Sequence, residues 1–265
     1  MLLTISPAKR LNLREYNGEL QLSEPFFIEK AQILNQHIRQ LDAIMLQALH
    51  GINEVLAYEN NKRNLNWGSS NYAKYAAVLC FDGEVYRGLA STSWSADTFE
   101  YAQSHLVILS GLYGFLKPMD AIWPYRLEMS TKLPDEIKKS LKIKNLKDFW
   151  QEDAKRFFAT FNNTDGLLIN LASKEYGEAI PKDLFDHVHE VDFFEVFPGK
   201  KPKKIQVYLK QARGQFARYV LENKIEFLKD TLSFQSSGYF YARELSNSHK
   251  SVFLRNHPIN GSIEN

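Results

Sequence analysis

Three groups of residues in this sequence have the types and spacing that suit anion binding. The first group lies directly after an apolar run at residues 2–5 and contains Ser6, Lys9 and Arg10. A loop that follows a strand presents its polar groups at the C-terminal end of that strand, where α/β proteins usually bind ligands. Lys9 and Arg10 would meet an anion there, although two cations on a solvated loop fit the same pattern.

The second group follows an apolar run at residues 106–109 and contains Ser110, Gly111, Tyr113 and Gly114. Glycine permits a positive φ and a close approach of the backbone, so N–H groups at this turn could hold phosphate oxygens. A plain tight turn is equally consistent. The pattern also loosely resembles a helix-hairpin-helix element, although that element usually has one residue between its glycines, and a strand followed by a loop fits at least as well.

Arg126 and Glu128 follow this turn on alternating residues, with Leu127 between them. In an extended segment, this spacing places both side chains on the same side. They would either form a structural ion pair or line an anion-binding cleft.

The third group is a basic segment at residues 200–230. Lys203 and Lys204 are among the lysines near its start. It contains nine basic and three acidic residues, a net charge of +6, whereas the other 234 residues sum to −4. If residues 211–223 form a helix, an advance of about 100° per residue places Lys210, Arg213 and Arg218 on one face.

Gly214 and Ala217 lie between these cations on the same predicted face. Small residues there would let a phosphate backbone approach the helix. They would equally mark close packing against another element, with the cationic side chains extending around it.

The charge of the whole chain is nearly balanced. Its 265 residues include 33 Lys and Arg against 31 Asp and Glu, which gives a net charge of +2. Generic nucleic-acid binders usually have a more basic domain, so any anion site must be local.

The single cysteine and the lengths of the apolar runs indicate the cellular compartment of the protein. Cys80 is the one cysteine and lies in an apolar run, which fits a buried core residue and a reducing cytoplasm. No segment has the roughly 18 uninterrupted apolar residues of a membrane helix, and residues 1–9 lack a signal-peptide pattern. We therefore expect a cytoplasmic protein with no membrane partner.

The motifs GxSxG, GxxxxGK[ST], HExxH and GxGxxG are absent, and with them the common signatures of hydrolases, P-loop proteins, zincins and dinucleotide-binding enzymes. The sequence therefore leaves open whether the protein is an enzyme, and we expect no cofactor. His187 and His189 lie beside acidic residues, as metal ligands do, but a strand simply places alternate residues on one face. We expect a solvated strand edge there and no metal site.

The order of elements predicts a mixed α/β (α+β) fold. Short runs rich in Val, Ile and Leu predict strands at residues 2–5, 76–81, 106–109, 167–171, 188–196, 205–209 and 237–241. Helical periodicity predicts helices at residues 25–60, 97–105, 146–161 and 211–223, the first of them capped by Ser23.

Polar stretches at residues 60–71 and 132–147 predict surface loops. No linker or repeat divides the chain, so we expect one compact domain over residues 1–265. That domain would have a mixed sheet, surrounding helices, a basic cleft and a frayed tail after about residue 246.

Several collinear blocks of the sequence resemble the YaaA family of peroxide-stress resistance proteins, and together they cover nearly the whole chain. The blocks are residues 5–9 (ISPAK), 81–89 (FDGEVYRGL), 109–114 (LSGLYG), 124–129 (PYRLEM), 169–176 (INLASKEY), 210–214 (KQARG) with Arg218, and 238–240 (GYF). Two departures are small: Arg10 stands where a small hydroxyl residue is common, and Gln211 replaces a frequent lysine.

The resemblance implies a DNA-binding protein that limits iron-driven oxidative damage, with a positively charged cleft and a helix-hairpin-helix-like element. By matched position, the implied cleft cations are Lys9, Arg126, Lys210, Arg213 and Arg218. The implied polar companions, which would bind a nucleotide or hold the loops together, are Ser6, Ser110, Asn170 and Ser173.

Two functions follow as hypotheses. In the first, the protein binds DNA, either duplex or distorted and partly single-stranded, largely independently of sequence, because Lys and Arg neutralise phosphates. Lys203 and Lys204 would add to the cleft cations, and Tyr113 or Tyr125 would stack on unpaired bases.

In the second hypothesis, the protein is an enzyme that acts on a nucleobase or a nucleotide-like small molecule. Its motivation is a group of side chains expected to meet near the strand ends, where a carboxylate and a lysine support acid–base chemistry. The members of this group are Lys9, Ser110, Arg126, Glu128 and Ser173.

Overall fold

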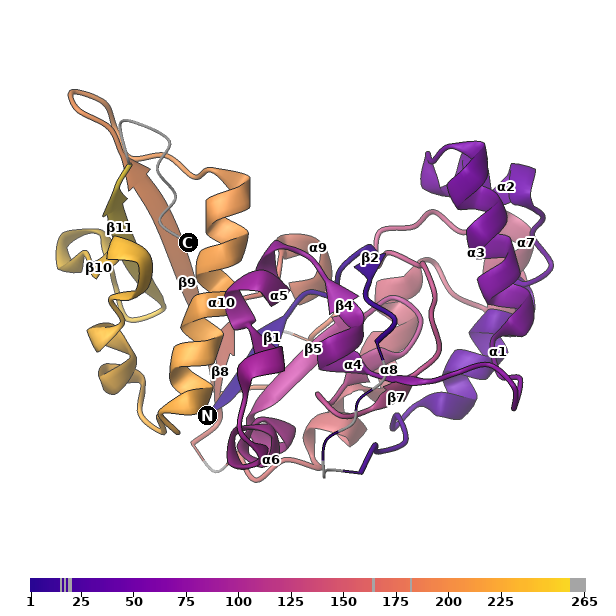
Figure 1. The fold of residues 1–265 in the computed structure, drawn as a ribbon, viewed down its shortest axis with the longest axis horizontal. Helices are drawn as coiled ribbons and strands as arrows, with labels where there is room; N and C mark the ends of the chain where they lie inside the picture. The colour runs from indigo at the N-terminus through magenta and orange to yellow at the C-terminus, as the bar shows by residue number, and fades with distance from the viewer. Residues whose placement is uncertain (15, 17, 19–20, 164, 182, 258–265) are drawn as a thin grey trace.

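The computed structural model describes residues 1–14, 16, 18, 21–163, 165–181 and 183–257, and a seven-stranded sheet runs through its centre (Figure 1). The strand order is β10-β11-β9-β8-β1-β5-β6. These strands are β1 (Leu2–Ile5), β5 (Leu106–Ser110), β6 (Gly114–Leu116), β8 (Leu167–Asn170), β9 (His187–Val196), β10 (Phe240–Tyr241) and β11 (Lys250–Asn256). Two small antiparallel pairs join β2 (Arg10–Leu11) to β4 (Phe81–Asp82) and β3 (Tyr75–Ala76) to β7 (Ala121–Ile122).

Helices pack around the sheet, with α1 to α3 and α7 gathered at one end and α10 lying along β9 at the other (Figure 1). The helices are α1 (Ile28–Ile38), α2 (Ala43–His50), α3 (Glu54–Asn66), α4 (Ala77–Cys80), α5 (Glu84–Leu89), α6 (Ala96–His105), α7 (Asp135–Leu141), α8 (Leu146–Phe158), α9 (Lys174–Gly177) and α10 (Gln206–Glu222). Among the described helices, none combines the length and the apolar character needed to cross a bilayer. The predicted mixed α/β fold with a mixed sheet is confirmed.

The five inner strands are parallel, and the edge strands β6 and β10 are antiparallel to their neighbours. Every residue of β1 and β5 is buried, because a parallel strand is covered on both faces and therefore reads as a continuous apolar run. β1 pairs with β5 on one side and with β8 on the other. The chain thus reverses its direction across the sheet at β1, and such a switch point opens a crevice at the strand ends.

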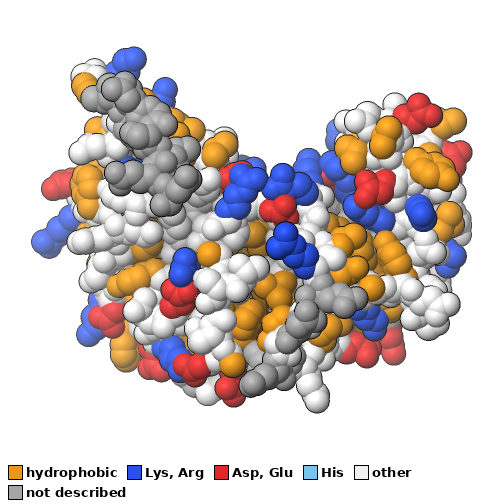
Figure 2. All heavy atoms as spheres, viewed as in Figure 1, with side chains coloured by type: hydrophobic (Ala, Val, Ile, Leu, Met, Phe, Trp, Pro, Cys, Tyr) orange, Lys and Arg blue, Asp and Glu red, His pale blue; other side chains and the backbone are white. Residues whose placement is uncertain are grey.

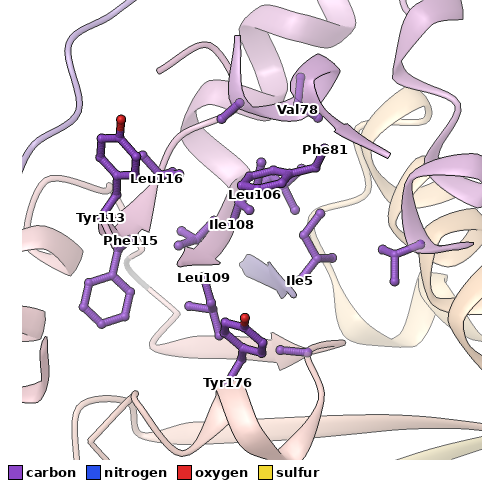
Figure 3. Close-up of a cluster of buried hydrophobic side chains, with 14 of the residues drawn as sticks. Ile5, Val78, Phe81, Leu106, Ile108, Leu109, Tyr113, Phe115, Leu116 and Tyr176 are labelled. Carbon is purple, nitrogen blue, oxygen red and sulfur yellow. The ribbon is translucent and has the colours of Figure 1, made fainter. Parts of the chain in front are cut away.

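The buried side chains form one large cluster around these strands. Figure 3 shows part of it, where Ile5 of β1, Phe81 of β4 and Ile108 of β5 lie together. Cys80 belongs to the same cluster, and burial raises the pKa of its thiol to about 12. The predicted core position of Cys80 is therefore confirmed.

Two of the predicted strands are wrong. Residues 77–80 form the single turn of α4, and residues 206–209 open α10. Both segments are short apolar runs without alternation, and such runs do not distinguish a strand from a buried helix. α10 begins at Gln206, earlier than the predicted helix at residues 211–223. Its buried residues recur at helical spacing, namely Leu209, Ala212, Phe216 and Val220.

The helix predicted over residues 25–60 is three helices. Asp42 and Asn53 cap α2 and α3, because their side chains accept hydrogen bonds from the N–H groups of Met45 and Leu56. Gly51, at φ +58°, ends α2 in the left-handed conformation. The prediction that Ser23 caps the first helix is wrong. Its hydroxyl instead donates a hydrogen bond to Asp120 Oδ1 at 2.7 Å.

The two predicted surface loops are partly helical. α3 continues to Asn66, with Asn60 and Asn64 buried, and α7 occupies much of the second stretch. Asn60 and Asn64 are polar but not solvated, and the Asn60 side chain donates a hydrogen bond to the Leu56 carbonyl. Composition alone therefore misjudged these segments.

The chain beyond residue 246 was predicted to fray, but residues 250–256 form β11 between β9 and β10. Arg255 of this strand pairs with the buried Glu195 at 2.9 Å. Residues 258–265 lie outside the described residues. The solvated strand edge predicted at His187 and His189 is also wrong, because β9 is an inner strand of the sheet. His189 is buried, and its ring lies 2.9 Å from the Ser251 hydroxyl.

α5 and α10 pack backbone to backbone through two glycines. A Cβ on Gly88 would overlap the Gln211 carbonyl of α10, and a Cβ on Gly214 would overlap the Val85 carbonyl of α5. The small residues of the basic helix therefore mark close packing against α5 rather than an open surface for phosphate. This contact fixes the position of α10 against the loops at the strand ends.

We predict that Gly214→Ala lowers the free energy of unfolding by about 1–3 kcal/mol, because the new methyl group forces the helices apart. Urea denaturation measures this loss. The control is Arg218→Ala on the same helix, where the side chain pairs with Glu222 at the surface and the change should stay within about 0.5 kcal/mol. Equal losses in the two variants would show that the helices do not touch at Gly214.

Candidate functional site

A cavity of about 560 Å³ opens at the C-terminal ends of β1 and β8, between α5 and α10. The loops after these strands, the segment 125–128 and the first half of α10 form its walls. Figure 2 shows Lys and Arg side chains gathered on the floor of the hollow in the upper edge of the molecule. We call this cavity the cleft. Its charged lining residues are six cations (Lys9, Arg10, Arg87, Arg126, Lys210 and Arg213) and four acids (Asp82, Glu84, Glu128 and Glu175).

The carboxylate of Glu128 lies at the meeting point of three separate segments. Lys9 Nζ, from the loop after β1, is 3.3 Å from Glu128 Oε1, and Arg126 lies 3.1 Å from the same oxygen. His50, the last residue of α2, places Nδ1 3.1 Å from Oε2. The Glu128 carboxylate therefore connects the β1 loop, its own extended segment and the α2–α3 pair.

The surroundings of Glu128 keep it ionised. Burial alone would raise its pKa, but the hydrogen bond with His50 and the charges of Arg126, His50 and Lys9 outweigh burial and hold the pKa at about 2. The carboxylate is thus a fixed negative charge among cations at every physiological pH.

Several buried polar atoms around this carboxylate have no hydrogen-bond partner among the described residues. They are His50 Nε2, Arg126 Nε, Glu128 Oε1 and, on α10, Arg213 Nε. The contacts of Glu128 Oε1 with Lys9 and Arg126 are therefore ionic rather than directional. Native proteins leave few buried polar atoms unpaired, so a group of them in one place calls for an explanation.

Lys210 and Arg213 enter the cleft from α10, and neither forms an ion pair with the part of the chain that the structure describes. Lys210 is exposed. The Arg213 guanidinium is largely enclosed, and burial lowers its pKa, although the charges of Asp192 and Glu190 partly oppose this effect. Both cations are thus free to meet an anion.

Two serines hold the strand-end loops together. The backbone N–H of Ser173 donates to Ser6 Oγ at 2.8 Å, and the two hydroxyls lie 3.3 Å apart. The Tyr86 hydroxyl, on α5, donates to the Ser6 carbonyl at 3.1 Å. These bonds position the β1 loop, and with it Lys9, at the edge of the cleft.

The structure brings together several of the residues singled out from the sequence. Those that line the cleft are Ser6, Lys9, Arg126, Glu128, Ser173, Lys210 and Arg213. Arg126 and Glu128 form the ion pair that one alternative predicted, and both also line the cleft. Anion binding by this pair stays a prediction.

Three of the proposed cations lie outside the cleft lining. Lys203 stacks on the Phe197 ring, and Lys204 pairs with Asp192 at 2.7 Å. Arg218 lies further along α10 and pairs with Glu222 at 2.8 Å. Their charges are partly satisfied within the protein, which makes them useful controls.

Ser110, Gly111, Tyr113 and Gly114 do not line the cleft. They form the buried turn between the antiparallel strands β5 and β6, so a helix-hairpin-helix at this position is wrong. Tyr113 cannot stack on a base, because its fully buried hydroxyl accepts hydrogen bonds from Trp67 and from the Trp123 backbone. The turn serves core packing.

Two further polar residues have structural partners. The Ser110 hydroxyl lies 2.6 Å from the Tyr125 hydroxyl, and Tyr125 is the one of the two proposed stacking tyrosines that reaches the cleft wall. Asn170 accepts hydrogen bonds from Thr4 and from the Ala172 backbone, and so supports the end of β8. Ser110 therefore does not join the polar group expected at the strand ends.

The sequence arguments missed Arg87 and His50. Arg87 lies in the block 81–89 and pairs with Glu84 at 2.6 Å, as Arg10 pairs with Asp82 at 2.7 Å. Alternating acidic residues ahead of an arginine were the available signal. No local signal marks His50, because its partner Glu128 is 78 residues away in the chain.

Within the described residues, no group of three or more His, Cys, Asp or Glu side chains is arranged to hold a metal ion. The His187 and His249 rings are tilted by 33° to each other, with centroids 5.1 Å apart. The His187 ring is 3.0 Å from the Ser248 carbonyl, which gives it a protein partner.

Comparison with known proteins places these features in a family. The family described as peroxide stress protein YaaA matches residues 1–245. A UPF0246 protein of Psychrobacter sp. (strain PRwf-1) is 40% identical over 96% of this chain and 98% of its own. UPF0246 proteins of Roseobacter denitrificans and Legionella pneumophila (strain Lens) are 39% and 35% identical, each over 97% of this chain and over 99% and 100% of their own.

We predict that Glu128→Gln destabilises the protein at neutral pH by about 2 kcal/mol, after allowance for solvent screening, because Lys9 and Arg126 lose their counter-charge. The folded pKa of about 2 lies below the usual 4.5. The stabilisation is therefore fully present above pH 4.5 and is lost as the pH falls through 2. Urea denaturation at neutral pH and at a series of acidic pH values measures it.

The matched control is Glu175→Gln. Glu175 also lines the cleft, but its carboxylate accepts hydrogen bonds from Ser130 instead of contacting cations. The difference in stability between wild type and Glu128→Gln should shrink with acid. At neutral pH, Glu175→Gln should cost less stability than Glu128→Gln, because no ion pair is lost. A constant difference across the acid range would contradict the role given to Glu128.

Proposed function

The chain belongs to the peroxide stress protein YaaA family and so has a role in peroxide stress, and we propose that it fulfils this role by binding DNA in the cleft. The observation that carries the proposal is the gathering of six cationic side chains around one hollow in a chain whose net charge is only +2. Lys and Arg side chains neutralise the phosphates of a DNA backbone, and such binding is largely independent of sequence.

The exposed cations support contact with a phosphate backbone. Lys9 and Arg10 have side chains that are 68% and 60% exposed, and Lys210 is exposed opposite them. They lie on different walls of the cleft, on the β1 loop and on α10. A DNA strand lying in the cleft would therefore meet cations from both sides.

The α2–α3 pair offers a second contact with the backbone. Its connection is only Gly51 to Asn53, and Gly51 and Asn53 are exposed. His50, next to this turn, contacts Glu128, which lines the cleft. The N–H groups of Gly51 and Ile52 already donate to the Gln47 carbonyl. In this proposal the helix-hairpin-helix-like element is α2–α3, where N–H groups at the start of α3 would face a phosphate, and not the turn at Gly111 to Gly114.

DNA binding also explains in physical terms how the protein would limit iron-dependent damage. Polyanionic DNA holds a layer of condensed cations, and a protein that neutralises phosphates releases them. Ferrous ions held in this layer would be displaced together with the other cations. Peroxide would then meet less iron at the covered DNA.

A second candidate function is an enzyme that acts on a nucleobase or nucleotide in the same cleft. The observation that favours it is the ionised carboxylate of Glu128 beside the amine of Lys9 in an enclosed site. Incubation with a panel of nucleosides and nucleotides, followed by mass spectrometry, tests it. Products that disappear in Glu128→Gln would support catalysis, whereas an unchanged panel would leave DNA binding as the function of the cleft.

We predict that the double variant Lys9→Ala/Lys210→Ala weakens duplex binding and flattens its salt dependence. The slope of log K against log salt should fall by about one unit for each lost phosphate contact, or about two units in total. Fluorescence anisotropy of a labelled duplex over a range of salt concentrations measures the slope.

The control for this experiment is Lys203→Ala/Arg218→Ala, which removes the same charge from sites outside the cleft lining. Its salt slope should stay close to that of the wild type. The site assignment fails if the control flattens the slope as much as the cleft variant does.

We further predict that the wild-type protein protects supercoiled plasmid from nicking by ferrous iron and peroxide, and that Lys9→Ala/Lys210→Ala protects less in proportion to its weaker binding. Agarose gel electrophoresis of the nicked and supercoiled forms measures protection. Protection that stays complete in a variant unable to bind DNA would show that the protein acts on iron or peroxide instead.

A further inference from the structure

Three buried polar atoms without a hydrogen-bond partner belong to side chains that line the inner part of the cleft. They are two donors, Arg126 Nε and Arg213 Nε, and one acceptor, Glu128 Oε1. They come from different elements, the extended segment 125–128 and α10, so no single strained loop explains them. A ligand that accepts from the arginines and donates to the glutamate would satisfy all three.

The unpaired charge of Arg213 indicates what kind of group the ligand carries. The other guanidinium groups of the cleft each have a carboxylate within 3.1 Å, namely Asp82 for Arg10, Glu84 for Arg87 and Glu128 for Arg126. Arg213 has no such ion pair among the described residues, although it is largely enclosed, and only the charges of Asp192 and Glu190 partly offset its burial. An enclosed cation without an ion-pair partner is unfavourable in the empty protein, so we take the missing partner to be an anion.

The size and the walls of the cleft indicate what accompanies that anion. Its volume of about 560 Å³ is far larger than one phosphate needs and falls in the range of small-molecule sites. Tyr86, Tyr125 and Tyr176, all mostly buried, belong to the lining of the cleft. Aromatic rings suit a planar base, and Glu128 Oε1 suits a donor group on a base or a sugar.

We infer that the inner cleft binds a nucleoside monophosphate, with its phosphate at Arg213 and Arg126 and its base or sugar donating to Glu128. The position at the C-terminal ends of β1 and β8, where the strand order reverses, is where parallel α/β sheets bind such ligands. The nucleotide is either free or one unit of a nucleic-acid strand, since both present the same phosphate, sugar and base. The inference concerns the enclosed arginines and does not depend on duplex binding by the exposed lysines.

Isothermal titration calorimetry with the four deoxynucleoside monophosphates tests the inference. At least one should bind saturably, and at least about tenfold more tightly than its nucleoside and than inorganic phosphate, because loss of a charge-assisted hydrogen bond costs about 10- to 100-fold in affinity. No saturation by any of the four up to roughly 10 mM would overturn the inference. Equal binding of inorganic phosphate or of ribose 5-phosphate would also overturn it, because the base would then play no part.

Arg213→Met and Arg218→Met form a matched pair on the same helix, inside and outside the cleft. Arg213→Met should weaken nucleotide binding by about 10- to 100-fold, whereas Arg218→Met should leave it unchanged. Without ligand, Arg213→Met should melt no lower than the wild type, because an unpaired enclosed charge has been removed. A clear fall in its melting temperature would show that Arg213 has a structural partner, and would overturn the inference.

Competition distinguishes the two sources of the nucleotide. If the cleft takes a nucleotide from a strand, a duplex with one extrahelical nucleotide should displace the bound monophosphate. If the cleft takes free nucleotide, neither this duplex nor a fully paired one should displace it. Retained duplex binding without any monophosphate binding would remove this inference alone. Retained monophosphate binding without duplex binding would remove only the proposed DNA-binding function.

Discussion

The ionic contacts of the Glu128 carboxylate organise the cleft. They draw Lys9, Arg126 and His50 from separate parts of the chain to one point, at distances of 3.1 to 3.3 Å. Without the carboxylate, Lys9 and Arg126 would lose the negative charge that both contact. The pKa of Glu128 is about 2, so the carboxylate stays ionised at physiological pH. Its contacts therefore fix both the positions and the charges of the groups around it.

The sheet and one helix contact decide where the remaining cations lie. The parallel strands β1 and β8 end side by side, so the loops that carry Ser6 and Ser173 meet and bond there. Gly88 and Gly214 let α5 and α10 approach backbone to backbone, which places Arg213 and Lys210 opposite the β1 loop. Outer cations remain exposed for a long polyanion, whereas Arg213 is enclosed and suits a single compact anion.

Much of the fold could be predicted from the sequence, because strands that are buried on both faces read as unbroken apolar runs. β1, β5 and β8 are such cases, and the strand-end argument correctly placed Ser6 and Lys9 at a cavity. The same reading failed at residues 77–80, where an apolar run is one turn of buried helix. β11 was missed because its apolar centre, Val252 to Leu254, is short and flanked by polar residues near the end of the chain.

The site was harder to predict than the fold, because its contacts join distant residues. Tyr113 and Gly114 have the composition of a ligand-binding turn, but their neighbours are Trp67 and the ring of Trp150 in the core. His50 carries no local signal and reaches Glu128 only through the placement of α2. Similarly, the sequence correctly indicates that several cations lie on one face of α10, but it does not show that close packing at Gly214 removes part of that face from solvent.

A crystal structure of the protein with a short DNA duplex tests the central claim most directly, since that claim concerns where the anion lies. The account predicts phosphates in the cleft, within hydrogen-bond distance of Lys9 and Lys210. It also predicts the turn from Gly51 to Asn53 against the same strand. Duplex bound on another face, for example at Lys203 and Lys204, with the cleft occupied only by water, would contradict it.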